Sequence, residues 1–210
     1  MPQLCIIFDL DGTLVDSEKL CNQAFVDLLP ELTESVESLT EFNRGKKLAT
    51  ILTDIEVRLG HVLPADFEAI YRERVADLFK HHLEPTPGTP EMLEALSHPR
   101  CVASSGPSGK IAHALRLSGL AEYFGNNTFS SYEVGSWKPE PGLFLHAAKS
   151  MGFHPVQCVV VEDSEVGLVA AQAAGMRALH YAPAHPAPHP SSFRHMRELP
   201  ALIESIANAA

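Results

Sequence analysis

The sequence is short of positive charge. Among its 210 residues, Lys and Arg number 16 against 26 Asp and Glu, which gives a formal net charge of −10. A chain this acidic is a poor general binder of nucleic acid or of an anionic membrane surface, because both are polyanions. A protein of this charge must handle any anion locally, with a metal ion or a few well-placed cations.

The sequence also lacks the features of export and of membrane insertion. No apolar run is long enough to cross a bilayer, and the first residues carry no basic leader of the signal-peptide kind. Its four cysteines form no CxxC pair, and Cys5, Cys101 and Cys158 stand in apolar runs, which predicts buried, reduced thiols. These absences predict a cytoplasmic protein that binds neither membrane nor nucleic acid.

Short apolar runs alternate with helical patterns along most of the chain. Hydrophobic residues make up 45% of the sequence, which is ordinary for a globular protein of one domain or of a core with a small insert. Continuous apolar strands alternating with helices predict an α/β fold, a Rossmann-like parallel sheet covered on both faces, with ligands beyond the carboxyl ends of its strands. The expected strands are residues 4–8, 101–103, 157–161 and 176–181.

One stretch, from about residue 17 to residue 82, interrupts this alternation. Apolar side chains recur there at helical spacing over residues 48–59 and again over 67–79. We therefore expect an all-helical insert, residues 16–85, between the first two strands. The core is then residues 1–15 plus 86–210.

Two segments of the sequence are rich in proline. The first, residues 84–90 (EPTPGTP), is typical of a return linker and hinge. The second, residues 182–190 (APAHPAPHP), contains two histidines, and we expect an exposed loop rather than a metal site because prolines break the usual ligand spacing.

The first predicted strand ends in the acidic motif DLDGT, which contains Asp9, Asp11 and Gly12. Two carboxylates beside a glycine that allows a sharp turn form a hard-oxygen site suited to Mg²⁺. One carboxylate can act as a nucleophile while the other transfers protons. An acidic turn or helix cap is the alternative, but unpaired charges at a buried strand end cost too much free energy.

Three further motifs carry polar residues. Two of them lie at the ends of predicted strands, and the third lies in a loop that prolines stiffen. Residues 104–107 (SSGP) offer hydroxyl and backbone N–H groups to an anion, although such a sequence is also a common turn. Lys138 lies in WKPEP, where two prolines favour a fixed position able to neutralise a phosphate. Glu162 and Asp163 form a second acidic pair at a strand end, and capping of the next helix by Asp163 or Ser164 is the alternative.

Taken in order, DLDGTLVDSE, ASSG, WKPEP and VVVEDSEVG resemble the motifs of the haloacid dehalogenase superfamily of phosphotransferases. The resemblance covers essentially the whole chain. The helical insert after the first strand resembles the mobile cap of the β-phosphoglucomutase-like branch. An Asp at position 11 is typical of the members that act on phosphate esters rather than on halides or phosphonates.

The resemblance implies a role for each motif. Asp9 would be the nucleophile that forms an aspartyl-phosphate, Asp11 the acid and base, and Lys138 the link between nucleophile and phosphate. The phosphate would be held by Ser104 with help from Leu10, Ser105 and Gly106. The Mg²⁺ ligands would be the Asp9 carboxylate, the Asp11 backbone carbonyl, Asp163, and Glu162 directly or through water.

Within this branch the resemblance implies that the cap selects the substrate. Its basic loop, residues 43–47 (NRGKK), carries Arg44 and Lys47, which we expect to meet a second anionic group of the substrate, whereas Lys46 is equally well explained as solvated. LVDSEKLCNQAF, SSGPSGK and SWKPEPGLFLHAAKSMG resemble the bacterial 6-phosphogluconate phosphatases. A small phosphorylated metabolite is therefore the expected partner, for a chain that is a monomer or a weak dimer.

The resemblance implies a Mg²⁺-dependent phosphatase acting on a small phosphorylated sugar or sugar acid, and this is the function that we expect. The alternative is a mutase of the β-phosphoglucomutase type. Those mutases carry a His in the first cap helix, and Cys21, which stands at that position, cannot replace it at neutral pH. A catalytically silent binding protein on the same fold is disfavoured because no nucleophile or metal ligand is missing.

Overall fold

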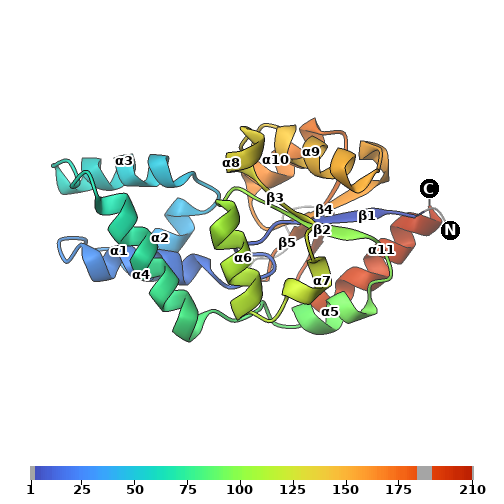
Figure 1. The fold of residues 1–210 in the computed structure, drawn as a ribbon, viewed down its shortest axis with the longest axis horizontal. Coiled ribbons are helices and arrows are strands. Elements are labelled where there is room, and N and C mark those ends of the chain that lie inside the picture. Colours follow the sequence, from blue (N-terminus) through green and yellow to red (C-terminus); the bar gives the residue numbers. More distant parts are fainter. Residues whose placement is uncertain (1–2, 184–190, 210) are drawn as a thin grey trace. The chain divides into compact units, whose positions relative to one another are not determined.

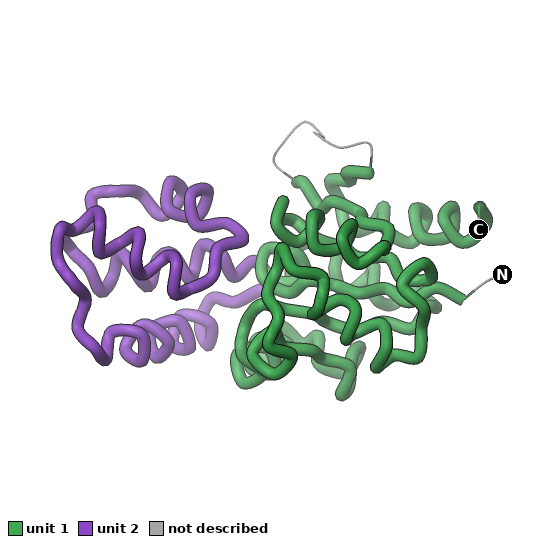
Figure 2. The backbone as a smooth tube through the Cα atoms, turned by 90° about the horizontal axis from the view of Figure 1, so that it is seen from above, with its two compact units in different colours: residues 1–15, 85–210 green, residues 16–84 purple. Residues whose placement is uncertain are grey.

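The chain forms two compact units in the computed structural model, which describes residues 3–183 and 191–209. Unit 1 consists of Met1–Val15 and Pro85–Ala210, and unit 2 of Asp16–Glu84 (Figure 2). Pro85, which the sequence-based division placed in the insert, groups with unit 1, where it bridges to Val15. Most of the proline-rich segment 182–190 lies outside the described residues.

Unit 1 is built on a parallel sheet of six strands in the order β3-β2-β1-β4-β5-β6, of which Figure 1 labels β1 to β5. This confirms the α/β fold with a parallel sheet. The strands are β1 (Cys5–Phe8), β2 (Arg100–Ser104), β3 (Thr128–Ser130), β4 (Cys158–Glu162), β5 (Arg177–Tyr181) and β6 (Ser192–Phe193).

Two strands were not expected from the sequence. β3 has 3 residues and β6 has 2, so neither is long enough to show an apolar run. β4 begins one residue later than expected, because Gln157 ends the short 3-10 helix Pro155–Gln157.

Helices cover both faces of the sheet. Those of unit 1 are α5 (Thr89–Ala95), α6 (Ser108–Leu117), α7 (Ala121–Phe124), α8 (Ser131–Val134), α9 (Gly142–Met151), α10 (Glu165–Ala173) and α11 (Leu199–Asn208). α9 and α10 pack on one face in an apolar cluster that includes Cys5, Cys101 and Cys158, which confirms these cysteines as buried thiols without disulfides. On the other face, where α5, α7 and α11 lie, Phe124 meets Phe8 edge to face (Figure 1).

The order of the strands indicates where on the sheet a ligand would bind. β2 and β3 lie on one side of β1, and β4, β5 and β6 lie on the other, so the direction of winding reverses at β1. In open parallel sheets ligands bind at such a reversal, beyond the carboxyl ends of the strands. The acidic motifs after β1 and at the end of β4 meet there, because β1 and β4 pair in parallel.

The return segment after unit 2 is shorter than the sequence suggested. α5 begins at Thr89, inside the expected linker 84–90, with Pro90 in its first turn. Gly88 precedes the helix with a φ of +85°, a conformation that suits glycine. Thr86 is also ordered, because its N–H donates to the carbonyl of Leu14.

Unit 2 is all-helical, as the insert was expected to be. Its helices are α1 (Glu18–Leu28), α2 (Val36–Asn43), α3 (Leu48–Leu59) and α4 (Phe67–His82). The rings of Phe25 and Tyr71 stack with centroids 4.2 Å apart between α1 and α4. Inside the unit, the buried Asn43 amide donates to Asn22 Oδ1 at 2.7 Å, which ties α2 to α1.

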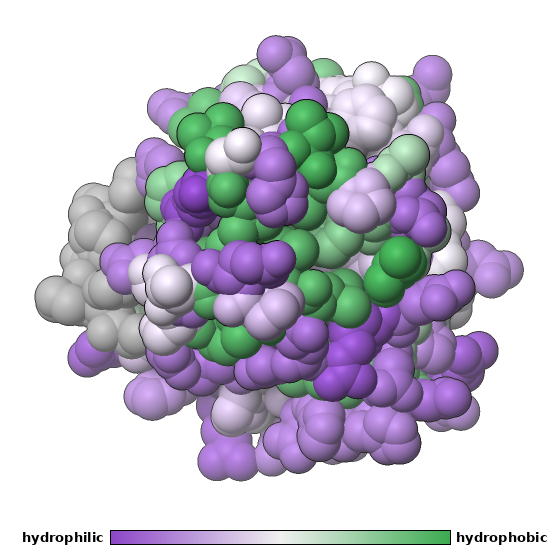
Figure 3. Space-filling view, turned by 90° about the vertical axis from the view of Figure 1, so that its left-hand side faces the viewer, coloured by the Kyte–Doolittle hydropathy of each residue, from purple (hydrophilic) through white to green (hydrophobic). Residues whose placement is uncertain are grey.

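The surface mixes polar and apolar groups. The face shown in Figure 3 carries green apolar side chains among purple polar ones. In unit 2 the exposed large apolar side chains are Phe42, Val57, Val62 and Ile70. Over the described residues, no helix combines the length and the apolar character needed to span a membrane.

The stacked pair in unit 2 generates a stability prediction. Phe25→Ala removes a side chain that is 1% exposed, so the free energy of unfolding should fall by ~3–5 kcal/mol. Ile70→Ala is the matched control, because Ile70 is 41% exposed and its truncation should cost no more than about 0.5 kcal/mol. Urea unfolding followed by circular dichroism measures both. Equal losses in the two variants would contradict the assignment of Phe25 to the core of unit 2.

Candidate active site

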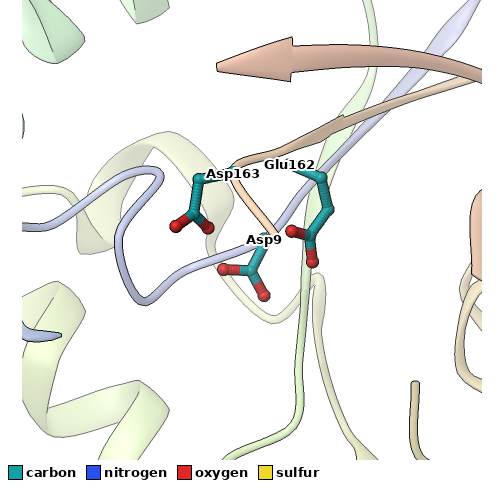
Figure 4. A group of neighbouring side chains, drawn as sticks. All are labelled: Asp9, Glu162 and Asp163. Atoms are coloured by element: carbon teal, nitrogen blue, oxygen red, sulfur yellow. The ribbon is translucent and has the colours of Figure 1, made fainter. Parts of the chain in front are cut away.

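Three carboxylates converge at the carboxyl ends of β1 and β4. Asp9 directly follows β1, Glu162 ends β4, and Asp163 comes next (Figure 4). One oxygen from each lies within 4.8 Å of the others. The Asp9 N–H donates to the carbonyl of Val161, so the first turn after β1 is still held by the sheet.

Lys138 is the buried cation of this site. Its Nζ donates to Asp9 Oδ1 and to Glu162 Oε1, and both carboxylates are buried with it. Burial by itself would lower the pKa of Lys138, but the charges of Asp9 and Glu162 outweigh that effect and raise it. The ammonium therefore stays charged, as a residue that must neutralise anions requires.

One lysine does not balance the acidic groups around it. Burial raises the pKa of Asp9 to about 7, and the charges of Glu162 and Asp11 add to this while Lys138 opposes it. A buried carboxyl group of this kind, beside two further carboxylates, would be stabilised in its charged form by additional positive charge. The donor set, carboxylate oxygens from Asp9, Glu162 and Asp163, is the kind that hard divalent cations prefer, so the residues present fit a metal ion.

Glu162 has both of its oxygens engaged. Oε1 accepts from Lys138, and Oε2 accepts from the N–H and the hydroxyl of Ser164, each at 2.8 Å. The Ser164 hydroxyl in turn accepts from the Gly167 N–H at 3.2 Å and so caps α10. The capping alternative is therefore confirmed for Ser164, in addition to its contact with Glu162.

Asp163 is fixed from both sides. The hydroxyl of the fully buried Thr13 donates to its Oδ1 at 3.1 Å. Gly12 has a φ of +82°, and a Cβ there would lie 2.5 Å from Asp163 Oδ2, so only glycine fits. His180 Nε2 lies 3.2 Å from the backbone oxygen of Asp163, and its Nδ1 lies 3.1 Å from Ser192 Oγ.

Sequence reasoning missed these supporting groups. Thr13 stands inside the DLDGT motif, and its contact with Asp163 joins residues 150 positions apart. His180 lies near the end of β5 and pairs in register with Glu162. A polar residue at the end of an apolar strand run was the available signal for His180.

The end of β2 contributes a hydroxyl and a turn. Ser104 is buried, and its Oγ accepts from the N–H of Gly106 at 3.1 Å. A Cβ built on Gly106 would lie 3.4 Å from Ser104 Oγ and 4.0 Å from Asp11 Oδ2, so Ser104 and Asp11 gather around one glycine. Leu10 is fully buried and its carbonyl accepts from Leu14 and Val15, whereas Ser105 is partly exposed.

The predicted residues of the basic loop belong to unit 2. Arg44 follows α2, and its Nε donates to Glu18 Oε2 at 3.1 Å. Lys47 directly precedes α3. Lys46 donates to Asp54 at 2.8 Å and lies over the ring of Phe42, so it is bound within the unit rather than merely solvated.

A parallel sheet whose carboxyl edge carries buried carboxylates, a charged lysine and a serine is suited to the transfer of a phosphoryl group. Comparison of the sequence with known families identifies the family of this chain. The profile of the haloacid dehalogenase-like hydrolases matches residues 4–175, and the chain belongs to that family.

Two relatives are enzymes of Escherichia coli K12. The chain is 37% identical over 205 residues to 6-phosphogluconate phosphatase, covering 94% of this chain and 93% of that one. It is 30% identical over 177 residues to fructose-1-phosphate phosphatase, covering 83% and 94%. These relatives confirm the resemblance drawn from the motifs.

Solved structures agree over the whole length. A haloacid dehalogenase-like protein from Agrobacterium tumefaciens C58 superimposes with a TM-score of 0.85 at 32% identity, covering 98% of this chain and 100% of that one. A family hydrolase from Deinococcus radiodurans R1, solved with bound phosphate and sodium, superimposes with a TM-score of 0.80 at 28% identity, covering 98% and 97%.

The packing of Glu162 generates a prediction about Gly167. A Cβ at position 167 would lie 2.0 Å from Glu162 Cδ, so Gly167→Ala must displace Glu162 or shift α10. We expect a loss of at least ~2 kcal/mol in unfolding free energy, as for overpacked cores, with weaker divalent-metal binding by calorimetry. Gly109→Ala is the control, since Gly109 lies in α6 with nothing within 4 Å of its Cβ position. Unchanged metal binding in Gly167→Ala would contradict this account.

Proposed function

We propose that this protein is a Mg²⁺-dependent phosphatase that hydrolyses a small phosphorylated sugar or sugar acid through an aspartyl-phosphate on Asp9. The observation that carries this proposal is the Asp9 carboxylate, buried at the end of β1 and held by Lys138 beside Glu162 and Asp163. The family membership and the phosphatases among the relatives support it.

The reaction has two halves. An oxygen of Asp9 attacks phosphorus, and the bond from phosphorus to the ester oxygen breaks while Asp11 gives that oxygen a proton. Asp11, now a carboxylate, takes a proton from water as the water attacks the aspartyl-phosphate. Inorganic phosphate leaves and both aspartates return to their starting states. Ser104 is proposed to hold a phosphoryl oxygen, with the N–H groups of Leu10, Ser105 and Gly106 beside it.

The metal is proposed to be held by the carboxylates of Asp9 and Asp163 and by the backbone carbonyl of Asp11. Glu162 fits a contact through water better than a direct one, because both of its oxygens already accept hydrogen bonds. When bound, Mg²⁺ supplies the positive charge that lets an anionic carboxylate approach an anionic phosphate. Lys138 supplies the remaining charge from its buried position.

We propose further that the helical insert, residues 16–85 by the sequence-based division, acts as a cap that selects the substrate. Arg44 and Lys47 would bind a second anionic group, such as the carboxylate of a sugar acid. The relative named for 6-phosphogluconate supports a substrate of this class. A mutase remains disfavoured, because Cys21 in α1 replaces the histidine expected of that reaction.

The nucleophile is tested by Asp9→Asn. We expect phosphate release with Mg²⁺ to fall by at least about 1,000-fold, because an amide cannot form the covalent intermediate. The wild-type protein in EDTA is the parallel assay and should lose activity to a similar degree. Retained turnover in a clean preparation of Asp9→Asn would refute the proposed function. If the wild-type protein converted β-glucose 1-phosphate to glucose 6-phosphate without releasing free phosphate, it would be a mutase instead.

The substrate class is tested by Arg44→Met. With 6-phosphogluconate as substrate, KM should rise roughly tenfold, which corresponds to the loss of about 1.4 kcal/mol of binding to the carboxylate. With glucose 6-phosphate, which has no carboxylate, KM should stay within about twofold. Lys80→Met, an exposed cation of α4, is the matched control. Equal increases in KM for both substrates would refute carboxylate recognition by Arg44.

A further inference from the structure

Lys110 contacts the proposed acid and base from within unit 1. It is the third residue of α6, and its Nζ donates to Asp11 Oδ1 at 2.7 Å across 99 residues of sequence. The two side chains are 25% and 26% exposed. None of the roles described above uses Lys110.

The two oxygens of Asp11 lie beside different groups. The stem of Lys110 runs past Gly106, where a Cβ would lie 3.4 Å from Lys110 Cδ and 3.4 Å from Ser104 Oγ. The same point is 4.0 Å from Asp11 Oδ2. The ammonium therefore holds Oδ1, while Oδ2 lies toward the glycine that also borders Ser104.

Stability does not account for this arrangement. A partly exposed ion pair contributes about 0–1 kcal/mol, because solvent screens it and two long side chains lose freedom. Lys138, by contrast, is buried between its partners and needs them. A carboxylate that transfers protons must, however, present one oxygen in a defined direction, and small misplacements cost large factors in rate.

We propose that Lys110 is the positioning residue for Asp11: by holding Oδ1 it orients Oδ2 toward the ester oxygen that leaves. This inference rests on the proposed function, in which Asp11 gives and takes the proton. The orienting group comes from α6 of unit 1, the same unit that carries Asp9 and Ser104. Lys110 touches neither the substrate nor the reacting atoms in this role.

The dependence on the leaving group separates positioning from structural support. An alkoxide leaving from a sugar phosphate needs the proton from Asp11, whereas nitrophenolate is a good leaving group and does not. In Lys110→Met, kcat/KM for the best sugar phosphate should fall roughly 10-fold to 100-fold, a part of what general acid catalysis contributes. For p-nitrophenyl phosphate it should fall less than about threefold.

Two further variants complete the test. Lys110→Arg keeps a donating cation and should recover activity to within about fivefold of wild type. Lys149→Met, an exposed lysine near the end of α9, is the matched control and should leave both substrates unchanged. Circular dichroism and the thermal midpoint verify that each variant is folded.

A double-mutant cycle with Asp11→Asn measures the coupling directly. Once Asp11 can no longer transfer a proton, Lys110→Met should change kcat/KM by less than about twofold, because the two residues act as one unit. Additive losses would overturn the proposal. So would an equal fall for both substrates in Lys110→Met, or a higher KM at unchanged kcat, which would show that Lys110 binds substrate.

The positioning role of Lys110 and the proposed phosphatase function can be refuted separately. If Asp9→Asn retains turnover, the phosphatase mechanism is wrong whatever Lys110 does. If Asp9→Asn is inactive and Lys110→Met behaves as wild type, only the positioning role is lost.

Discussion

The structure of the site depends on the buried ammonium of Lys138, which lies between Asp9 and Glu162. Ionised carboxylates taken out of water are stable only when paired and hydrogen-bonded. Glu162 meets that condition completely, with Lys138 on one oxygen and Ser164 on the other. Asp9 is paired with Lys138, but burial and the neighbouring charges of Glu162 and Asp11 raise its pKa. Asp9, the carboxyl group whose pKa is raised in this way, is the group that the proposed reaction uses as nucleophile.

Two glycines allow these charges to come so close together. Gly167 leaves room beside the Glu162 carboxyl group, and Gly12 leaves room beside Asp163, where any Cβ would collide. Gly12 lies in the turn that follows β1, and Gly167 lies in the first turn of α10, just after β4, near the point where the winding of the sheet reverses. The close approach of the backbone at these two glycines therefore helps to set the positions of the Asp163 and Glu162 carboxylates. Because those positions are set by covalent geometry and packing, the site is formed before any substrate arrives.

The sequence predicts the centre of the site better than its surroundings. Asp9, Glu162 and Asp163 follow apolar runs, and the ends of parallel strands share one edge, so their convergence follows from the pattern. The contacts of Thr13 and Lys110 join positions 150 and 99 residues apart, and no local pattern reports such a distance. β6 was missed for a different reason, since two residues cannot show a period.

The charged pairs formed by Lys138 and by Arg44 differ in solvent exposure, and this difference matches the different roles proposed for the two cations. Lys138 is buried and its partners cannot be exchanged without leaving a buried charge unpaired. Arg44 with Glu18 is a partly exposed pair in unit 2, and a pair of this kind contributes little net free energy, which is compatible with the role proposed for Arg44 in binding a substrate carboxylate. A residue proposed to recognise substrate must be able to exchange partners, whereas one that holds the nucleophile must not. Under the proposed function, burial therefore separates the cation that holds the nucleophile from the cation that would bind the substrate.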